Sequence, residues 1–209
     1  ARASRFRLPA ETIRDNALTA SGLLAGKMDG PPVYPPQPSN IWRHVGRNAP
    51  KYLTSQGVDR YRRGVYTVWR RSAPYPSFVT FDAPERGACV VARSRTNTPL
   101  QALTLANDAS FMEFVKGLSD RILKAGPTDD AGRVQFAFRA SLSRAPSGIE
   151  AEILERFVKS QRKHFEADAD AAKSAASATR PESSSVSESA VWTAVARVVL
   201  NLDEFITRE

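Results

Sequence analysis

Five prolines crowd the segment from Gly30 to Pro38, and this cluster most restricts how the first part of the chain can fold. Proline fixes φ and has no backbone N–H, so the segment is predicted to be extended and irregular. Two interpretations remain open. The segment is either a polyproline ligand for a docking partner or an ordered strap across the surface of the domain, and we favour the strap.

The rest of residues 1–97 is predicted to form a loop-rich basic half. Pro9 suits the first turn of a helix, which is expected to run as far as Gly26. Apolar residues over Asp59–Arg71 follow helical spacing and favour a second helix, although the same segment also has strand propensity. Prolines after Arg71 would end that helix, and residues 78–88 are predicted to be a loop.

Residues 98–166 are predicted to form a helical half. Thr98 and Gln101 have the spacing of a capping box, with Pro99 at the first helical position. Three more helices are expected from apolar stripes that are typical of a core. They are Phe111 to Leu123, Val134 to Leu142, and a helix after the capping box Ser147–Glu150 with Ile153, Leu154, Phe157 and Val158 facing inward.

The amino-acid composition changes twice over the last 43 residues. Residues 167–187 are nearly all Ala, Ser and Asp, without an apolar face, and are predicted to be a disordered insert. Residues 188–209 are predicted to form a deeply buried C-terminal core helix. The fold class expected for residues 1–209 is therefore mainly α, a single irregular helical domain with long Pro-rich loops and a single core.

Charge is unevenly distributed along the chain. The net charge is +8, and residues 1–100 hold 16 basic against 6 acidic residues. Arginine forks match carboxylate, sulfate and phosphate, so an anionic partner is a fair hypothesis. On a helix over Asp59–Arg71, Arg63 and Arg70 would share a face, because they are seven residues apart. The candidate anion-binding residues are Arg62, Arg63, Arg70, Arg71, Arg93 and Arg95.

A structural explanation of these arginines stays open. Asp59, Asp82 and Glu85 lie in the same half of the chain and would pair with several of them internally. Asp82 with Arg93 or Arg95 would be either an acid and the group that tunes it, or an ion pair that locks a loop.

Residue types that carry catalysis or hold metals are scarce. One cysteine, Cys89, and two histidines, His44 and His164, do not make a zinc site of the usual spacing, and no metal site is predicted. No haem-attachment motif is present, so no cofactor is expected on this chain. No stretch approaches the ~20 apolar residues of a membrane span. These features favour a non-catalytic domain.

Short motifs occur in a recognisable order along the chain. They are Tyr61-Arg62-Arg63, Phe81-Asp82-Ala83-Pro84, Thr96-Asn97-Thr98-Pro99-Leu100-Gln101-Ala102-Leu103, Asn107-Asp108 and Leu200-Asn201-Leu202-Asp203-Glu204-Phe205. We regard Asp82, Asn97, Thr98, Gln101 and Asn107 as their structural signature. Together the motifs resemble the C-terminal planctomycete-type domain of unknown function found in large proteins that also carry a cytochrome c segment.

The resemblance implies a setting but no active site. The chain would be the tail of an exported multidomain protein, periplasmic or extracellular, with upstream domains as partners and a haem c group on another segment. No signal peptide is recognised in this chain. The expected function is a non-catalytic structural or partner-binding module, and the alternative is binding or processing of anionic, sulfated polysaccharide. Nucleic acid is not expected as a partner, because no binding motif is recognised.

Overall fold

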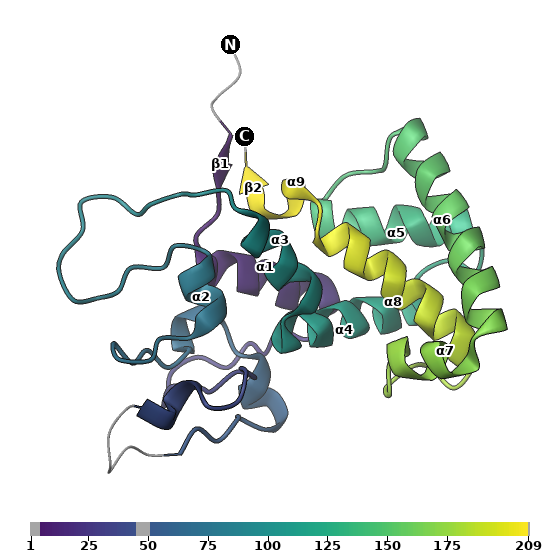
Figure 1. Cartoon of the computed structure of the whole chain (residues 1–209). Coiled ribbons are helices and arrows are strands. Elements are labelled where there is room, and N and C mark those ends of the chain that lie inside the picture. The colour runs from purple at the N-terminus through teal and green to yellow at the C-terminus, as the bar shows by residue number, and fades with distance from the viewer. Residues whose placement is uncertain (1–4, 45–50, 209) are drawn as a thin grey trace. The chain divides into compact units, whose positions relative to one another are not determined.

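The computed structural model describes residues 5–44 and 51–208 (Figure 1). These residues form α-helices, short 3-10 helices and two strands of two residues, so the predicted mainly α fold is confirmed. The chain divides into two compact units. Unit 1 comprises Ala1–Thr19, Leu23–Phe111 and Ile206–Glu209, and unit 2 comprises Ala20–Gly22 and Met112–Phe205. That the whole chain is one domain stays a prediction.

The ends of the chain meet in unit 1. Strand β1 (Phe6–Arg7) pairs antiparallel with β2 (Thr207–Arg208). The N–H of Leu8 extends this pairing by donating to the carbonyl of Ile206 at 2.9 Å. The pairing fixes the backbone on both sides of Arg7.

Helix α1 (Ala10–Ser21) begins directly after Pro9, as predicted. It ends at Ser21 rather than near Gly26, because Gly22 adopts a positive φ of 74°. This left-handed conformation ends helices and suits glycine. The N–H groups of the next two residues donate back to the Leu18 carbonyl at 3.0 and 3.1 Å.

The proline-rich segment is an ordered strap. The hydroxyls of Tyr75 and Ser110 donate to the Pro36 carbonyl at 3.2 and 3.1 Å, and Tyr52 donates to the carbonyl of Pro35. Val33 is buried and exchanges backbone hydrogen bonds with the segment that follows Gly64. The side chains therefore satisfy carbonyls that proline geometry keeps out of regular structure.

Residues Asp59–Arg71 do not form the predicted α-helix. Two short 3-10 helices, η2 (Gly57–Tyr61) and η3 (Gly64–Tyr66), are separated by extended backbone. The carbonyls of Tyr61 and Tyr66 accept hydrogen bonds from Ala25 and Val33, at 3.0 and 2.8 Å. These tertiary bonds outweigh the helical spacing of the side chains.

Gly64 explains why this segment lies so close to α1. A Cβ added to Gly64 would lie 2.8 Å from the carbonyl oxygen of Glu11. Only glycine permits that approach of two backbones.

Helix α2 (Pro76–Thr80) lies partly where a loop was predicted. Pro76 occupies the first helical turn, a position that tolerates proline because its missing N–H would have no helical partner there. The long segment from Phe81 to Thr98 contains neither helix nor strand and leads to α3 (Pro99–Asn107).

The first helices of unit 2 agree with the sequence patterns. They are α4 (Ala109–Ala125, whose first turn belongs to unit 1), α5 (Asp130–Leu142) and α6 (Gly148–Ala167). Asp129 caps α5 by accepting from the Gly132 N–H at 2.8 Å. Leu154 and Val158 are buried as expected, whereas Ile153 is half exposed, which corrects its predicted inward position.

The predicted disorder of residues 167–187 is wrong where α7 (Ala169–Ala175) forms. Asp168 caps this helix, and Ala172 is completely buried. Beyond α7, the Ser177 N–H donates to the Ser189 hydroxyl at 3.1 Å, and its own hydroxyl donates to Asp120 at 2.8 Å. Small side chains allow close packing, and polar bonds to neighbouring helices replace the missing apolar stripe.

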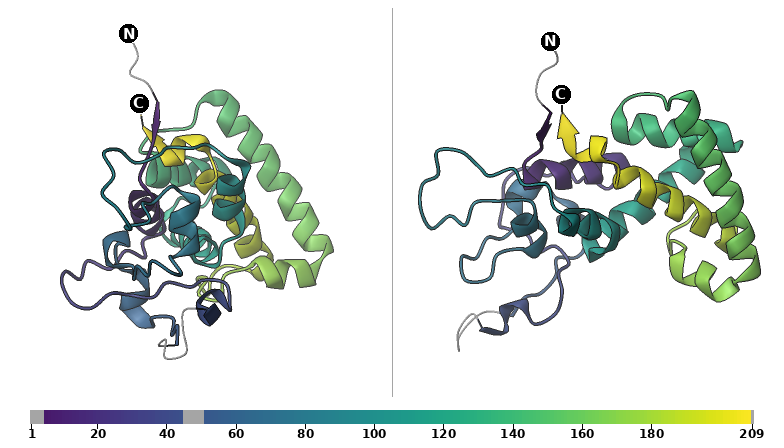
Figure 2. Two further views of the ribbon diagram at one scale, coloured as in Figure 1. Left: turned by 60° about the vertical axis from the view of Figure 1, so that its left-hand side comes forward. Right: turned by 45° about the horizontal axis from the view of Figure 1, so that its top comes forward.

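Helix α8 (Val186–Leu200) carries the core of unit 2. Its completely buried side chains include Val191, Trp192, Val195, Val199 and Leu200. It packs against α5, α6 and α7 (Figure 2). The predicted core helix does not continue to residue 209, because the chain turns at Asn201 into α9 (Asp203–Ile206) and β2. In the described part of the chain, no helix has the length and apolar character needed to cross a membrane.

Candidate functional site

Gln101 connects several elements of unit 1 through its side chain, which is 1% exposed. Its amide nitrogen donates to the Thr80 carbonyl at 2.9 Å and to the Thr96 hydroxyl at 3.2 Å. Its amide oxygen accepts from the Thr98 N–H at 3.2 Å, as the predicted capping box requires, and also from Arg7. Gln101 therefore joins α2, α3 and β1.

Asp82 locks the beginning and the end of the long segment between α2 and α3. It has a positive φ of 58°, and its carboxylate accepts from the Thr96 N–H at 2.7 Å and the Thr96 hydroxyl at 3.0 Å. It also forms an ion pair with Arg7. Asp82 therefore closes the segment, and its ion-pair partner is Arg7 rather than the expected Arg93 or Arg95.

Sequence reasoning missed Arg7 as a member of this site. Its side chain is 7% exposed, and its two terminal nitrogens donate to Gln101 and Asp82. No spacing pattern relates residues this far apart in a chain. The pairing of β1 with β2 brings Arg7 into place.

A pocket of about 590 Å³ opens beside this network. The volume lies within the range of ~300–1,000 Å³ that is typical of small-molecule sites. Its walls contain three guanidinium groups, one carboxylate, five apolar residues and one serine. They are Arg7, Leu8, Pro9, Phe81, Asp82, Val91, Ala92, Arg93, Ser94 and Arg95.

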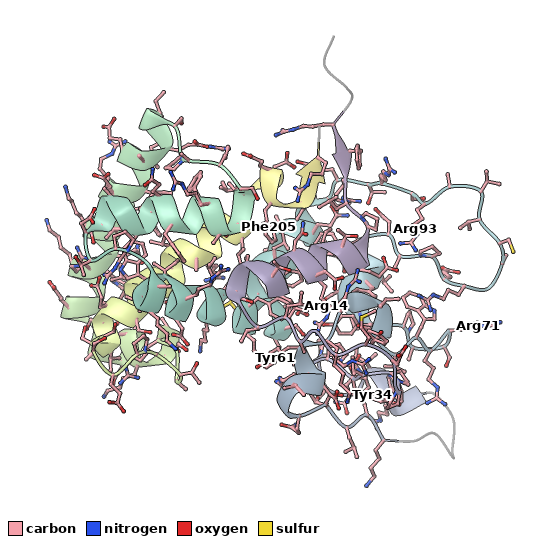
Figure 3. The ribbon with its side chains drawn as sticks, turned by 180° about the vertical axis from the view of Figure 1, so that it is seen from behind. Arg14, Tyr34, Tyr61, Arg71, Arg93 and Phe205 are labelled. Atoms are coloured by element: carbon pink, nitrogen blue, oxygen red, sulfur yellow. The ribbon has the colours of Figure 1, made fainter. Side chains whose placement is uncertain are left out.

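Arg93 and Arg95 are the two predicted anion-binding residues that line the pocket. Arg93 donates to the Glu11 carboxylate at 2.7 Å, and its side chain remains 42% exposed. The Arg95 guanidinium lies 4.9 Å from the centre of the Phe6 ring, a cation–π contact. Figure 3 shows Arg93 at the base of the long segment between α2 and α3.

The other predicted arginines do not converge on this pocket. Arg62 is completely buried, stacks on Tyr66 at 3.8 Å and donates to the carbonyls of Asp29 and Pro31. Its guanidinium therefore holds the strap, which corrects its assignment to an anion-binding surface.

Arg63, Arg70 and Arg71 also lie elsewhere in unit 1. Arg63 pairs with Asp15 at 2.9 Å, and this hydrogen bond raises the pKa of Arg63. Arg70 lies 4.8 Å from the centre of the Trp42 ring. Arg71 is exposed and distant from Arg93 (Figure 3). Because the segment is not an α-helix, Arg63 and Arg70 do not share a helical face.

The other signature and candidate residues lie outside the pocket. Asn97 is exposed, and Asn107 donates to the Leu103 carbonyl at 3.0 Å near the end of α3. Cys89 is an exposed free thiol, and the side chain of His44 lies outside the described residues. Across residues 5–44 and 51–208, no group of three or more His, Cys, Asp or Glu is placed to hold a metal ion.

A second buried polar cluster includes Tyr75, whose hydroxyl bonds the strap at Pro36. Arg14 donates to the Arg60 carbonyl at 2.9 Å, and burial lowers its pKa. Burial raises the pKa values of Tyr75 and Asp108, although Asp108 accepts from the Ser77 hydroxyl at 3.0 Å. Each of these groups has hydrogen-bond partners within the protein, which is typical of a structural network.

Comparison with protein families identifies a matching family model. The model of PSD1, described as "Protein of unknown function (DUF1553)", matches residues 1–158. This range contains every residue of the pocket and of the Arg7–Asp82–Gln101 network. Comparisons with curated proteins and with solved structures gave no match. The chain therefore belongs to the PSD1 family of proteins of unknown function (DUF1553).

Proposed function

We propose that this chain is a binding domain that holds the anionic group of another molecule in the pocket lined by Arg7, Arg93 and Arg95. The observation that carries the proposal is the excess of cations in one pocket: three guanidinium groups face a single carboxylate, that of Asp82. Guanidinium forks bind carboxylate and sulfate oxygens through paired, charge-assisted hydrogen bonds.

The three arginines would have different roles. The terminal nitrogens of Arg7 already bond Gln101 and Asp82, so Arg7 supplies fixed positive charge at the pocket wall. Arg93 uses one terminal nitrogen for Glu11 and retains donors for a ligand. Among the described residues, Arg95 has an aromatic contact with Phe6 and no hydrogen bond or ion pair. Arg95 and the remaining N–H groups of Arg93 are therefore the proposed ligand donors.

The carboxylate in the pocket supports a binding role. Both oxygens of Asp82 accept hydrogen bonds from Thr96, and one also contacts Arg7. A general acid or base needs a proton that it can exchange with a bound substrate. The oxygens of Asp82 are instead occupied in closing the long segment, which favours holding a ligand over transforming it.

The wider setting belongs to the same proposal. The motif succession from Tyr61 to Phe205 supports a place at the end of an exported multidomain protein of planctomycete type, with a cytochrome c segment elsewhere. The anionic ligand would then be either part of that protein or a sulfated polysaccharide met outside the cytoplasm. Mass spectrometry of the full-length protein from its source would test this setting, and a product without a haem-bearing segment would contradict it.

The pocket is tested by nuclear magnetic resonance of the arginine side-chain N–H groups. Titration with sodium sulfate should shift the Nε–H signals of Arg93 and Arg95. We expect a dissociation constant in the millimolar range, which corresponds to a binding free energy of about −4 kcal/mol. Replacement of Arg93 and Arg95 by alanine should abolish saturable binding.

A matched control keeps the change of net charge constant. Replacement of Arg43 and Arg71 by alanine also removes two exposed arginines of unit 1, but neither lines the pocket. This control should bind sulfate like the wild type. Equal loss in both double variants would mean that general positive charge, and not the pocket, attracts the anion.

A further inference from the structure

The walls of the pocket contain apolar residues as well as cations. Five of its ten lining residues are apolar, namely Leu8, Pro9, Phe81, Val91 and Ala92. Leu8 and Phe81 belong to the core, whereas Pro9, Val91 and Ala92 are exposed, so part of this apolar wall faces solvent. An exposed apolar surface beside charged residues is typical of protein–protein contact sites, in which arginine is also enriched.

Resting on the proposed function, we infer that the ligand is an acidic peptide segment, which places a carboxylate against Arg93 and Arg95 and a neighbouring apolar side chain against Val91. The carboxylate and the apolar side chain belong to adjacent residues of the partner. The pocket then binds a short motif of a protein rather than an isolated anion.

The distribution of hydrogen-bonding groups separates a peptide from a sulfated sugar. A sugar ring brings several hydroxyls, each of which loses hydrogen bonds with water on binding and needs a new partner. Ser94 is the single uncharged polar side chain of the pocket wall. A sugar would therefore leave hydroxyls unpaired against Pro9 and Val91, whereas an aliphatic side chain would bury there without that penalty.

The segment that carries Val91 combines both kinds of recognition. An unbroken run of small and apolar residues, 87–92, lies between Arg86 on one side and Arg93 and Arg95 on the other. Arg86 contacts Trp69, with its guanidinium 4.8 Å from the ring centre, and this holds the far end of the run. Asp82 and Thr96 hold its base through the bonds described above. The apolar run is therefore presented from a fixed base beside fixed cations.

The test uses the whole chain and fluorescence anisotropy of a labelled peptide, acetyl-Gly-Leu-Asp-Leu-Gly-amide. Two matched peptides replace the leucines by serine or the aspartate by asparagine. Each replacement should weaken binding about tenfold, the first by removing apolar burial and the second by removing the carboxylate.

Val91→Ser provides the matched protein variant, because Val91 is exposed and its replacement keeps all charges. This variant should bind the leucine and serine peptides equally weakly, while sulfate still shifts the Arg93 and Arg95 signals. A heparin hexasaccharide that binds more tightly than the leucine peptide, together with no effect of Val91→Ser, would overturn the inference and leave the proposed anion pocket intact. Absence of any sulfate response at Arg93 and Arg95 would overturn the proposed function itself.

Discussion

Arg7 and Asp82 form an ion pair across 75 residues of sequence, with side chains that are 7% and 16% exposed. The pair joins β1 to the residue that opens the long segment between α2 and α3. Gln101 contacts the same guanidinium, so one arginine connects three segments of unit 1. Because the pocket lies directly beside this pair, the stability of unit 1 and the shape of the pocket depend on the same contacts.

Arg7→Ala should therefore destabilise the protein by about 3 kcal/mol, because it leaves the largely buried carboxylate of Asp82 without its cation. Urea unfolding followed by tryptophan fluorescence measures the change. Arg95→Ala, which removes an exposed arginine of the same pocket, is the control and should stay within about 0.5 kcal/mol of the wild type. Equal stability of the two variants would contradict a structural role of Arg7.

The sequence predicted features that neighbouring residues determine. The capping boxes at Thr98 and Ser147 and the cap at Asp129 all start helices, because each cap needs only residues within one turn. The buried stripes of α4 and α5 follow from the same local periodicity. Arg7 could not be predicted as a site residue, since its role depends on β1 pairing with the other end of the chain.

Gln101→Ala tests the joint between α2 and α3. The substitution removes two hydrogen bonds that Gln101 donates, to Thr80 and Thr96, and one that it accepts from Arg7, which keeps its ion pair with Asp82. We expect a loss of about 2–3 kcal/mol in the free energy of unfolding. Asn97→Ala, at an exposed position of the same motif, should leave it nearly unchanged, and a similar loss in both would show that the motif acts through local helix formation alone.

The failures of sequence reasoning share one physical cause. The apolar spacing of Asp59–Arg71 suits a helix, but the carbonyls of Tyr61 and Tyr66 bond to distant backbone instead. Arg62 is a charged residue of a type usually found at the surface, yet it is buried and donates to backbone carbonyls. No local sequence pattern predicts that contact. Two of the candidate arginines reach the pocket because the long segment folds back onto Asp82, which is again a tertiary contact.

Acid should weaken unit 2 through Glu150. Hydrogen bonds from Arg144 lower the pKa of Glu150 to about 2 from an ordinary value of 4.5. A carboxyl with a lowered pKa stabilises the folded state fully above its unfolded value and loses that contribution as the pH falls from about 5 toward 2. Glu150→Gln should therefore flatten the decline of stability over this range. An unchanged pH profile of urea unfolding in the variant would contradict the assignment.

Limited proteolysis tests where the chain is open. Residues 167–187, expected to be disordered from their composition, include α7 and bonds from Ser177 to Asp120 and Ser189, so protease should reach them slowly. The segment between α2 and α3 has no helix or strand, and its arginines are exposed at positions 86, 93 and 95. Trypsin should therefore cut first within this segment, and there more slowly after Arg93, whose pairing with Glu11 protects it in part. Mass spectrometry of early fragments identifies the sites. First cleavage after Lys173 would show that α7 does not persist in solution. Saturating peptide ligand should slow cleavage after Arg93 and leave cleavage after Arg71 unchanged.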